Sequence, residues 1–171
     1  MDHFAVPAAF TILGATIGFI LGRINQRLDA RKSKNNFLRA IGIELRGLQG
    51  HLKDTKDTAD EALADFKNGK SELVNFTDSY ESTIFTTQFG KLADLSDERI
   101  LNAVELYSDI GAAQSHRDRL SSEGMAIVQL DSGDTSRQTR VEYYFKGLEH
   151  LSVIIWIVQE KIERLLPKLP T

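Results

Sequence analysis

Residues 141–165 read VEYYFKGLEHLSVIIWIVQEKIERL, and the spacing of their apolar side chains decides the fold. Apolar residues recur at alternating steps of three and four, which places them on one face of an α-helix. The eight positions of this stripe are Val141, Tyr144, Leu148, Leu151, Ile155, Val158, Ile162 and Leu165. The pattern predicts a long helix ended by Pro167, because proline lacks the amide hydrogen that a helix needs. Residues 153–158 are apolar on all sides, which predicts a central place in the packing.

Two further segments carry helical signals. Residues 37–66 repeat the same spacing in a stripe made of Leu38, Ile41, Leu45, Leu48 and Leu52. Asn68-Gly69 then favours a helix end. A second helix is expected to start at Ser96, because a hydroxyl cap followed by Asp97 and Glu98 suits a helix N-terminus. Its inner face is interrupted at residues 114–119, and the segment ends in a turn at 131–136.

Residues 70–95 are less regular and predict one short helix near residues 78–86, with a break at Gly90. Residues 37–171 are therefore expected to form an all-α, antiparallel bundle of three long helices and one short one. The sequence leaves open whether the first helix runs on from the N-terminal segment or breaks at residues 33–36.

The N-terminal segment is uncharged from Phe4 to Gly22 and reads FAVPAAFTILGATIGFILG. A bilayer core of about 30 Å needs roughly 20 apolar residues, so this stretch just meets the requirement. A buried core helix and an interfacial helix are the alternatives, but the run lacks the polar face that an interfacial helix shows. We expect residues 1–22 to be a single transmembrane anchor. No positive charge precedes the apolar run, so we expect the segment to stay uncleaved.

A basic collar follows at residues 23–36, and its cations come directly after the apolar run. These cations are Arg23, Arg27, Arg31, Lys32 and Lys34. Lysine and arginine near a membrane segment mark its cytoplasmic side, and they attract anionic lipid headgroups. The sequence predicts a single-pass protein of the inner (plasma) membrane, with its N-terminus outside and residues 37–171 in the cytoplasm.

Small residues lie together on one side of a helical wheel drawn for residues 4–22. The stripe that we expect to pack consists of Thr11, Gly14, Ala15, Gly18 and Gly22. In lipid, close backbone approach across such residues is what pairs helices. The stripe predicts self-association, or packing on the membrane helix of a partner.

Charge and composition exclude several classes of protein. The whole chain has a net charge of −3 although the collar supplies five cations, so the rest of the chain is acidic. An acidic body does not suit nucleic-acid binding, which needs a basic face. The absence of cysteine excludes disulfides, thiolate metal sites and thiol nucleophiles.

Three candidate sites have weaker support than their structural alternatives. Residues 64–71, ADFKNGKS, fit a permissive phosphate-loop pattern, but a helix and not a strand is expected before them. His51, His116 and His150 lack the Glu-x-x-His spacing of metal sites in bundles. The acidic residues near Asp57 lack the glycine turn of a calcium loop. We expect no catalytic residues, no cofactor and no metal, and therefore not an enzyme.

Three short runs carry a family resemblance: Tyr80-Glu81-Ser82, Leu95-Ser96-Asp97-Glu98 and Leu106-Tyr107. They resemble a pattern found in small bacterial membrane-anchored helical proteins of uncharacterised function. The resemblance covers about a quarter of the chain. It implies an all-helical cytoplasmic body behind an anchor, and it carries no functional residues.

These features predict an interaction or assembly protein that self-associates through its anchor and presents its bundle to cytoplasmic partners. No residue pattern identifies such a partner. The alternative is a membrane-acting effector of the phage-defence or toxin type, in which the bundle controls clustering of the anchor. A phage spanin would need its body outside the cytoplasm, which the collar argues against. An enzyme without a recognisable motif is the least favoured alternative.

Overall fold

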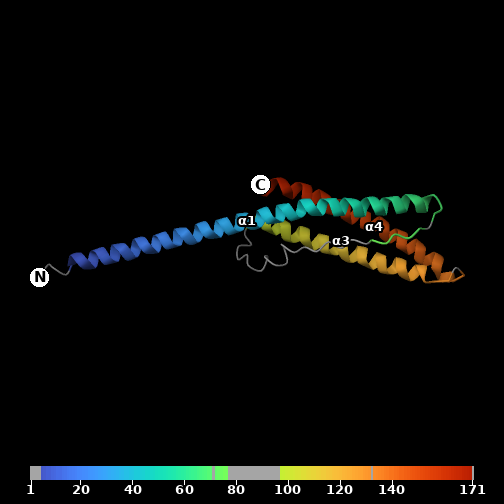
Figure 1. Cartoon of the computed structure of the whole chain (residues 1–171), viewed down its shortest axis with the longest axis horizontal. Coiled ribbons are helices and arrows are strands. Elements are labelled where there is room, and N and C mark those ends of the chain that lie inside the picture. The colour runs from blue at the N-terminus through green and yellow to red at the C-terminus, as the bar shows by residue number, and fades with distance from the viewer. Residues whose placement is uncertain (1–4, 71, 77–96, 132, 171) are drawn as a thin grey trace. The chain divides into compact units, whose positions relative to one another are not determined.

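A computed structural model describes the chain at residues 5–70, 72–76, 97–131 and 133–170, while the side chains of residues 5–21 and of Ile24 lie outside the described part. Within these ranges the structure is all-helical, with α1 (Ala5–Lys67), α3 (Glu98–Val128), α4 (Thr135–Leu165) and a 3₁₀ turn η2 (Leu166–Lys168) (Figure 1). The chain divides into two compact units, residues 1–37 and 38–171, and each is described by itself.

The first unit is the N-terminal part of α1. Helical backbone is assigned from Ala5 onward and continues without a break through residues 33–36. Among the described residues, no helical stretch combines the length and apolarity needed to cross a lipid bilayer. The side chains of Thr11, Gly14, Ala15 and Gly18, on which the anchor and its packing were predicted, lie outside the described residues.

In the second unit, α1 and α3 run in the same direction and α4 runs against both (Figure 1). Glu44 of α1 meets Tyr107 of α3, and residues 48–55 of α1 line one pocket with residues 110–117 of α3, so both numberings rise together. Between α3 and α4 the numberings run oppositely, since Arg140 bonds Glu123 whereas Lys161 bonds Glu105. The predicted all-helical bundle is confirmed for its three long helices. In a bundle whose successive elements alternate in direction, the first and third elements run the same way, and the short element predicted between α1 and α3 lies outside the described residues.

The length of the connection between α1 and α3 permits their parallel pairing. Residues 68–97 join the end of α1 to the start of α3, and about 30 extended residues can reach some 100 Å. This exceeds the length of α3, because a 31-residue helix spans about 46 Å. The short helix predicted near residues 78–86 and the break at Gly90 lie outside the described residues.

The apolar stripes predicted from the sequence form the core. All eight positions of the α4 stripe are buried, with relative exposures from 0 to 7 %. The α1 stripe from Leu38 to Leu52 is buried to the same extent, and Ile100, Leu106 and Ile110 of α3 complete the core. Each fully buried side chain of this size stabilises the fold by about 1.5–3 kcal/mol, so these stripes hold the bundle together.

The prediction that residues 153–158 are surrounded by packing is wrong. Ile155 and Val158 are buried, but Val153, Trp156 and Ile157 are 49, 52 and 41 % exposed. In the described part of the chain only two long helices pack against α4, and two neighbours cover only one side of a helix. The remaining side of α4 is exposed and carries these three apolar side chains among charged ones.

Local signals set the helix ends. Gly69 has a φ of +84°, the left-handed conformation that ends α1 as predicted for Asn68-Gly69. The start of α3 was predicted at Ser96, but the cap is Asp97, whose carboxylate accepts from the Arg99 amide. Asp134 caps α4 within the predicted turn, and the hydrogen bonds it accepts from the hydroxyl and the amide of Ser136 lower its pKa.

We expect Leu148→Ala to lower the free energy of unfolding by about 2–5 kcal/mol, because Leu148 is fully buried and its loss leaves a cavity. Leu101→Ala is the matched control, because Leu101 is 49 % exposed on α3, and its expected effect is within about 0.5 kcal/mol. Urea unfolding followed by circular dichroism measures both. Equal effects of the two substitutions would contradict the described core.

Candidate interaction surfaces of the bundle

The collar residues predicted to meet lipid headgroups are on the surface of α1. Arg23, Arg27, Arg31 and Lys32 are exposed, and Lys34 is half-buried. Gly22, the one residue of the small-residue stripe whose surroundings are described, is also exposed. A Cβ built on it would have no atom within 4 Å. Within the described part of one copy, nothing packs against this position.

The connection after α1 is fastened to the bundle by one tyrosine. The Tyr144 hydroxyl accepts a hydrogen bond from the Val74 amide at 3.1 Å and donates one to the Val74 carbonyl at 2.8 Å. Its ring is 1 % exposed and lies against Gly124, where an added Cβ would come within 3.3 Å. Burial raises the pKa of Tyr144, although its bond to Val74 acts in the opposite direction. Residues 72–76 are thereby held along the bundle.

A cavity of about 300 Å³ lies between this fastened segment and the end of α3. Its lining includes Leu73, Val74 and Asn75 on one side and Ser121 and Met125 on the other. The Ser121 hydroxyl is buried and makes no hydrogen bond among the described residues. The cavity is open and mostly apolar, with few polar groups to orient a ligand.

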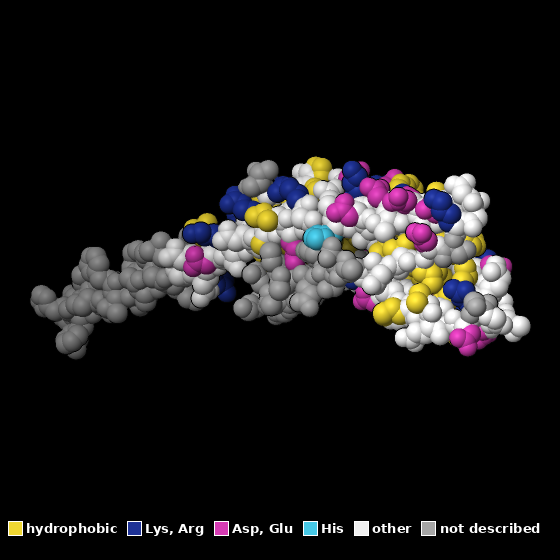
Figure 2. Space-filling model, turned by 45° about the vertical axis from the view of Figure 1, so that its right-hand side comes forward, with side chains coloured by type: hydrophobic (Ala, Val, Ile, Leu, Met, Phe, Trp, Pro, Cys, Tyr) yellow, Lys and Arg dark blue, Asp and Glu magenta, His cyan; other side chains and the backbone are white. Residues whose placement is uncertain are grey.

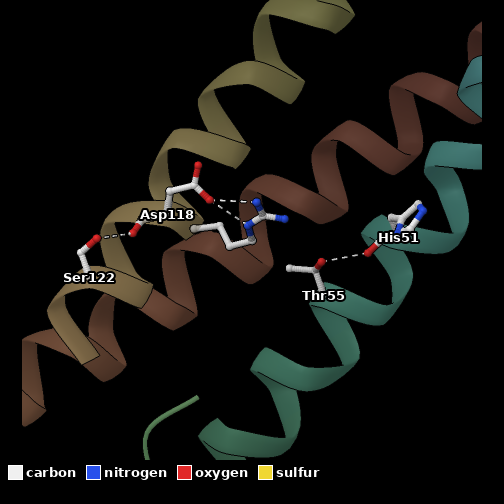
Figure 3. Close-up of polar contacts among 5 residues, drawn as sticks. His51, Thr55, Asp118 and Ser122 are labelled. Atoms are coloured by element: carbon white, nitrogen blue, oxygen red, sulfur yellow. Dashed lines mark hydrogen bonds and ion pairs between the residues drawn. The ribbon is translucent and has the colours of Figure 1, made fainter. Parts of the chain in front are cut away.

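The surface between α1 and α3 carries polar groups close to the core. The Tyr107 hydroxyl donates to Glu44 at 2.5 Å, and both side chains are buried. Arg117 is 7 % exposed, and its guanidinium donates to Asp118 on its own helix at 2.8 Å. Figure 3 shows Asp118 and Ser122 on α3, and His51 and Thr55 on α1. The Thr55 hydroxyl donates to the His51 carbonyl at 2.8 Å.

The predicted interruption of the α3 face at residues 114–119 is therefore wrong. The helix continues without a break, and Arg117 lies in line with the buried Ala113 and Leu120. Long arginine side chains can bury their aliphatic stem while the charged end reaches polar partners. A charged residue at a stripe position thus does not mark a break in the packed face.

Two of the three histidines weighed as metal ligands, His116 and His150, meet between α3 and α4. The His116 ring lies edge-on to the His150 ring, with centroids 5.2 Å apart. Arg119 donates to His116 Nδ1 at 2.9 Å, and His116 Nε2 is 3.0 Å from the Gly147 carbonyl. Guanidinium only donates, so Nδ1 is the acceptor and Nε2 carries the proton bonded to Gly147. Sequence reasoning missed this meeting, because 34 residues separate the two histidines.

Polar contacts also fasten the edges of α4 to its two neighbours. Lys161 donates to Glu105 at 2.8 Å and to Asp109 at 2.6 Å, and these bonds raise its pKa. On the α1 side, the Ser152 hydroxyl donates to Asp60 at 2.6 Å, and Asp60 also pairs with Lys56. Burial would raise the pKa of Asp60, but these two partners outweigh it and lower that pKa.

The candidate phosphate loop is the end of a helix. Residues 64–67 close α1, and Gly69 turns the chain, so the segment is preceded by a helix where a phosphate loop needs a strand. Lys70 pairs with Asp65 at 3.0 Å. Among the described residues, no group of three or more histidine, aspartate and glutamate side chains is arranged to hold a metal ion.

In Figure 2, acidic and basic side chains gather along the upper edge of the bundle, and hydrophobic side chains lie together below them. No protein-family model, no curated protein and no solved structure matches the chain.

We expect Tyr144→Phe to release residues 72–76, because it removes the hydroxyl that bonds both backbone groups of Val74. The expected loss of stability is about 1 kcal/mol, with faster amide hydrogen exchange at Val74. Tyr143→Phe is the matched control, because Tyr143 is 68 % exposed. Exchange at Val74 that is equally slow in both variants would contradict the fastening role.

Proposed function

We propose that this protein is a membrane-anchored interaction protein that self-associates through residues 1–22 and presents its helical bundle to cytoplasmic partners. The change at Gly22 and Arg23, from nineteen uncharged residues to five closely spaced cations, carries the proposal. Such a boundary is what a helix inserted up to a lipid headgroup layer requires.

The backbone of this segment supports insertion. Residues 5–22 have helical backbone. A helix satisfies its own amide and carbonyl groups, which lipid cannot do. The collar residues Arg23, Arg27, Arg31 and Lys32 are exposed, as contact with lipid phosphates requires. The proposed location is the inner membrane, with the N-terminus outside and the bundle in the cytoplasm.

The small-residue stripe supports pairing of the anchors. Gly14, Gly18 and Gly22 recur every four residues, the spacing that brings two helices into backbone contact in lipid. The surroundings of Gly22 agree with such a role, because the space beside it is empty of described atoms within one copy. A partner helix can enter that space without displacing any of these side chains.

The bundle supports an interaction role because its described polar groups largely pair with one another. Lys161, Arg140, Asp60 and Tyr144 all bind within the bundle, and these contacts fix helices rather than enclose a substrate. Stable helices with exposed side chains on their outer faces are suited to binding other proteins.

Protease protection in intact spheroplasts tests the placement in the membrane. We expect a tag on the N-terminus to be cleaved from outside, while residues 37–171 are cut only after permeabilisation. Recovery of the full chain in the soluble fraction without detergent would contradict the anchor. Digestion of the bundle in intact spheroplasts would contradict the orientation.

Replacement of glycines in the stripe tests the pairing. We expect Gly22→Leu and Gly18→Leu to reduce cross-linked dimers in membranes by at least about fivefold, because leucine blocks backbone contact. At Gly22, the described part of a single copy offers no contact that leucine could disturb. Ala9→Leu is the matched control, because it adds a larger side chain on the opposite side of the helical wheel. Unchanged cross-linking in both glycine variants would remove the proposed pairing.

A further inference from the structure

The exposed side of α4 has an apolar centre. Val153, Trp156 and Ile157 are 49, 52 and 41 % exposed. They are spaced by three and four residues, so they adjoin on one face of the helix. Large apolar side chains gathered in this way mark a surface where another protein binds. These three side chains are not needed for the core of the bundle, because the buried stripe on the opposite side of α4 supplies the contribution of this helix to the core.

Charges on either side of this centre are arranged with opposite signs at equal distances. Counting from Val153, Lys146 and Glu160 lie seven residues away, and Glu142 and Arg164 lie eleven residues away. These steps correspond to about 10 Å and about 16 Å along the helix. Glu142, Lys146 and Arg164 are exposed, and Glu160 is half-buried.

We propose that a second copy of this chain binds this face, with the two α4 helices antiparallel and a two-fold axis at Val153. This arrangement places Lys146 against the partner's Glu160 and Glu142 against the partner's Arg164. Symmetry repeats both pairs, as an isologous interface requires. A parallel arrangement would instead bring Lys146 against the partner's Lys146 and Glu160 against the partner's Glu160, which repel each other.

The spacing of this face fits helix pairing. The positions that share it follow alternating steps of four and three, which keeps them on one side of the helix, with the apolar Val153 and Trp156 at the centre and charged residues on either side. They are Glu142, Lys146, Glu149, Val153, Trp156, Glu160 and Glu163. Helix α4 thus carries two seams, one that forms the bundle core and one that faces outward.

Apolar contact and charge have separate parts in this interface. Burial of the two sets of Val153, Trp156 and Ile157 provides the attraction, with a contribution from each side chain that grows with the area covered. The ion pairs choose the orientation, because exposed pairs add little affinity and mainly disfavour wrong arrangements. Arg164 bonds Glu160 of its own helix at 2.7 Å, and a carboxylate can accept a further donor from the partner.

This interface extends the proposed self-association, but it does not depend on the anchor. The test uses the full chain in detergent, so a shared bilayer does not limit how two copies meet. The chain has no cysteine, which makes single-cysteine cross-linking specific.

Cysteine pairs test the orientation. We expect Val153→Cys to form a disulfide-linked dimer under mild oxidation, because the two-fold axis passes through this position. Differently tagged Lys146→Cys and Glu160→Cys chains should cross-link to each other with a short bis-maleimide at least about fivefold more than either does to itself, as opposite charges at equal distances require. Preferential self-linking of each variant would overturn the antiparallel arrangement, and the absence of any linked species would overturn the interface.

Charge reversal tests the pairing of residues. In a chain that carries Val153→Cys, adding Lys146→Glu or Glu160→Lys alone should reduce the disulfide-linked dimer at least about threefold, because like charges then face each other. Both changes in one chain should restore the dimer, since the partners are then exchanged. Glu72→Lys is the matched control, because Glu72 is exposed on the segment after α1. No recovery in the variant with both reversals would overturn the assigned pairs.

The same cross-linking in a Gly22→Leu chain separates this interface from the anchor. We expect the link between positions 146 and 160 to persist there. In the chain that keeps its glycines, a link between positions 146 and 160 without any anchor cross-linking in membranes would remove only the proposed anchor pairing. If instead the link between positions 146 and 160 is absent in detergent while the anchors still cross-link in membranes, only the α4 interface is removed.

Discussion

The bundle depends on burying one apolar stripe of α4 against α1 and α3 together. Leu148, Leu151, Ile155 and Val158 are all at most 1 % exposed, and the stripes of the other two helices face them. Helix α4 is the element that runs against both neighbours, and it is fastened to each of them along its edges (Figure 1). Because apolar burial is the main favourable term in folding, the remaining interactions only refine what this stripe determines.

The polar contacts refine it at the edges. Lys161 bonds Glu105 and Asp109 on the α3 side, while Ser152 bonds Asp60 on the α1 side. Exposed or half-exposed ion pairs contribute little stability, but they fix how far one helix slides along another. The Tyr144 hydroxyl fixes the position of the segment after α1 on the bundle, because it bonds both the amide and the carbonyl of Val74. A few hydrogen bonds at the edges of the apolar core therefore set the register of α4 against α1 and α3 and hold residues 72–76 on the bundle.

Sequence periodicity predicted which faces are buried but not how the helices are directed. Every stripe position of α4 is confirmed, because steps of three and four define a face regardless of its partner. The stripes alone do not give the shared direction of α1 and α3, since a stripe looks the same from both ends and residues 68–97 are long enough for either path. The meeting of His116 with His150 depends on that topology. The exposure of Trp156 depends on the number of neighbours, which no local pattern of six residues reveals.

The unequal connections distribute the entropic cost of folding unevenly. Residues 129–134 join α3 to α4, whereas residues 68–97 join α1 to α3. Loop closure costs more for a longer loop, and a roughly fivefold difference in length amounts to about 1.4 kcal/mol. Bringing α3 and α4 together therefore has a lower loop-closure entropy cost than bringing α1 and α3 together. Ile110 of α3 and Ile155 of α4 line one pocket with Leu48 and Leu52 of α1, so the α3–α4 hairpin supplies the surface on which the α1 stripe packs.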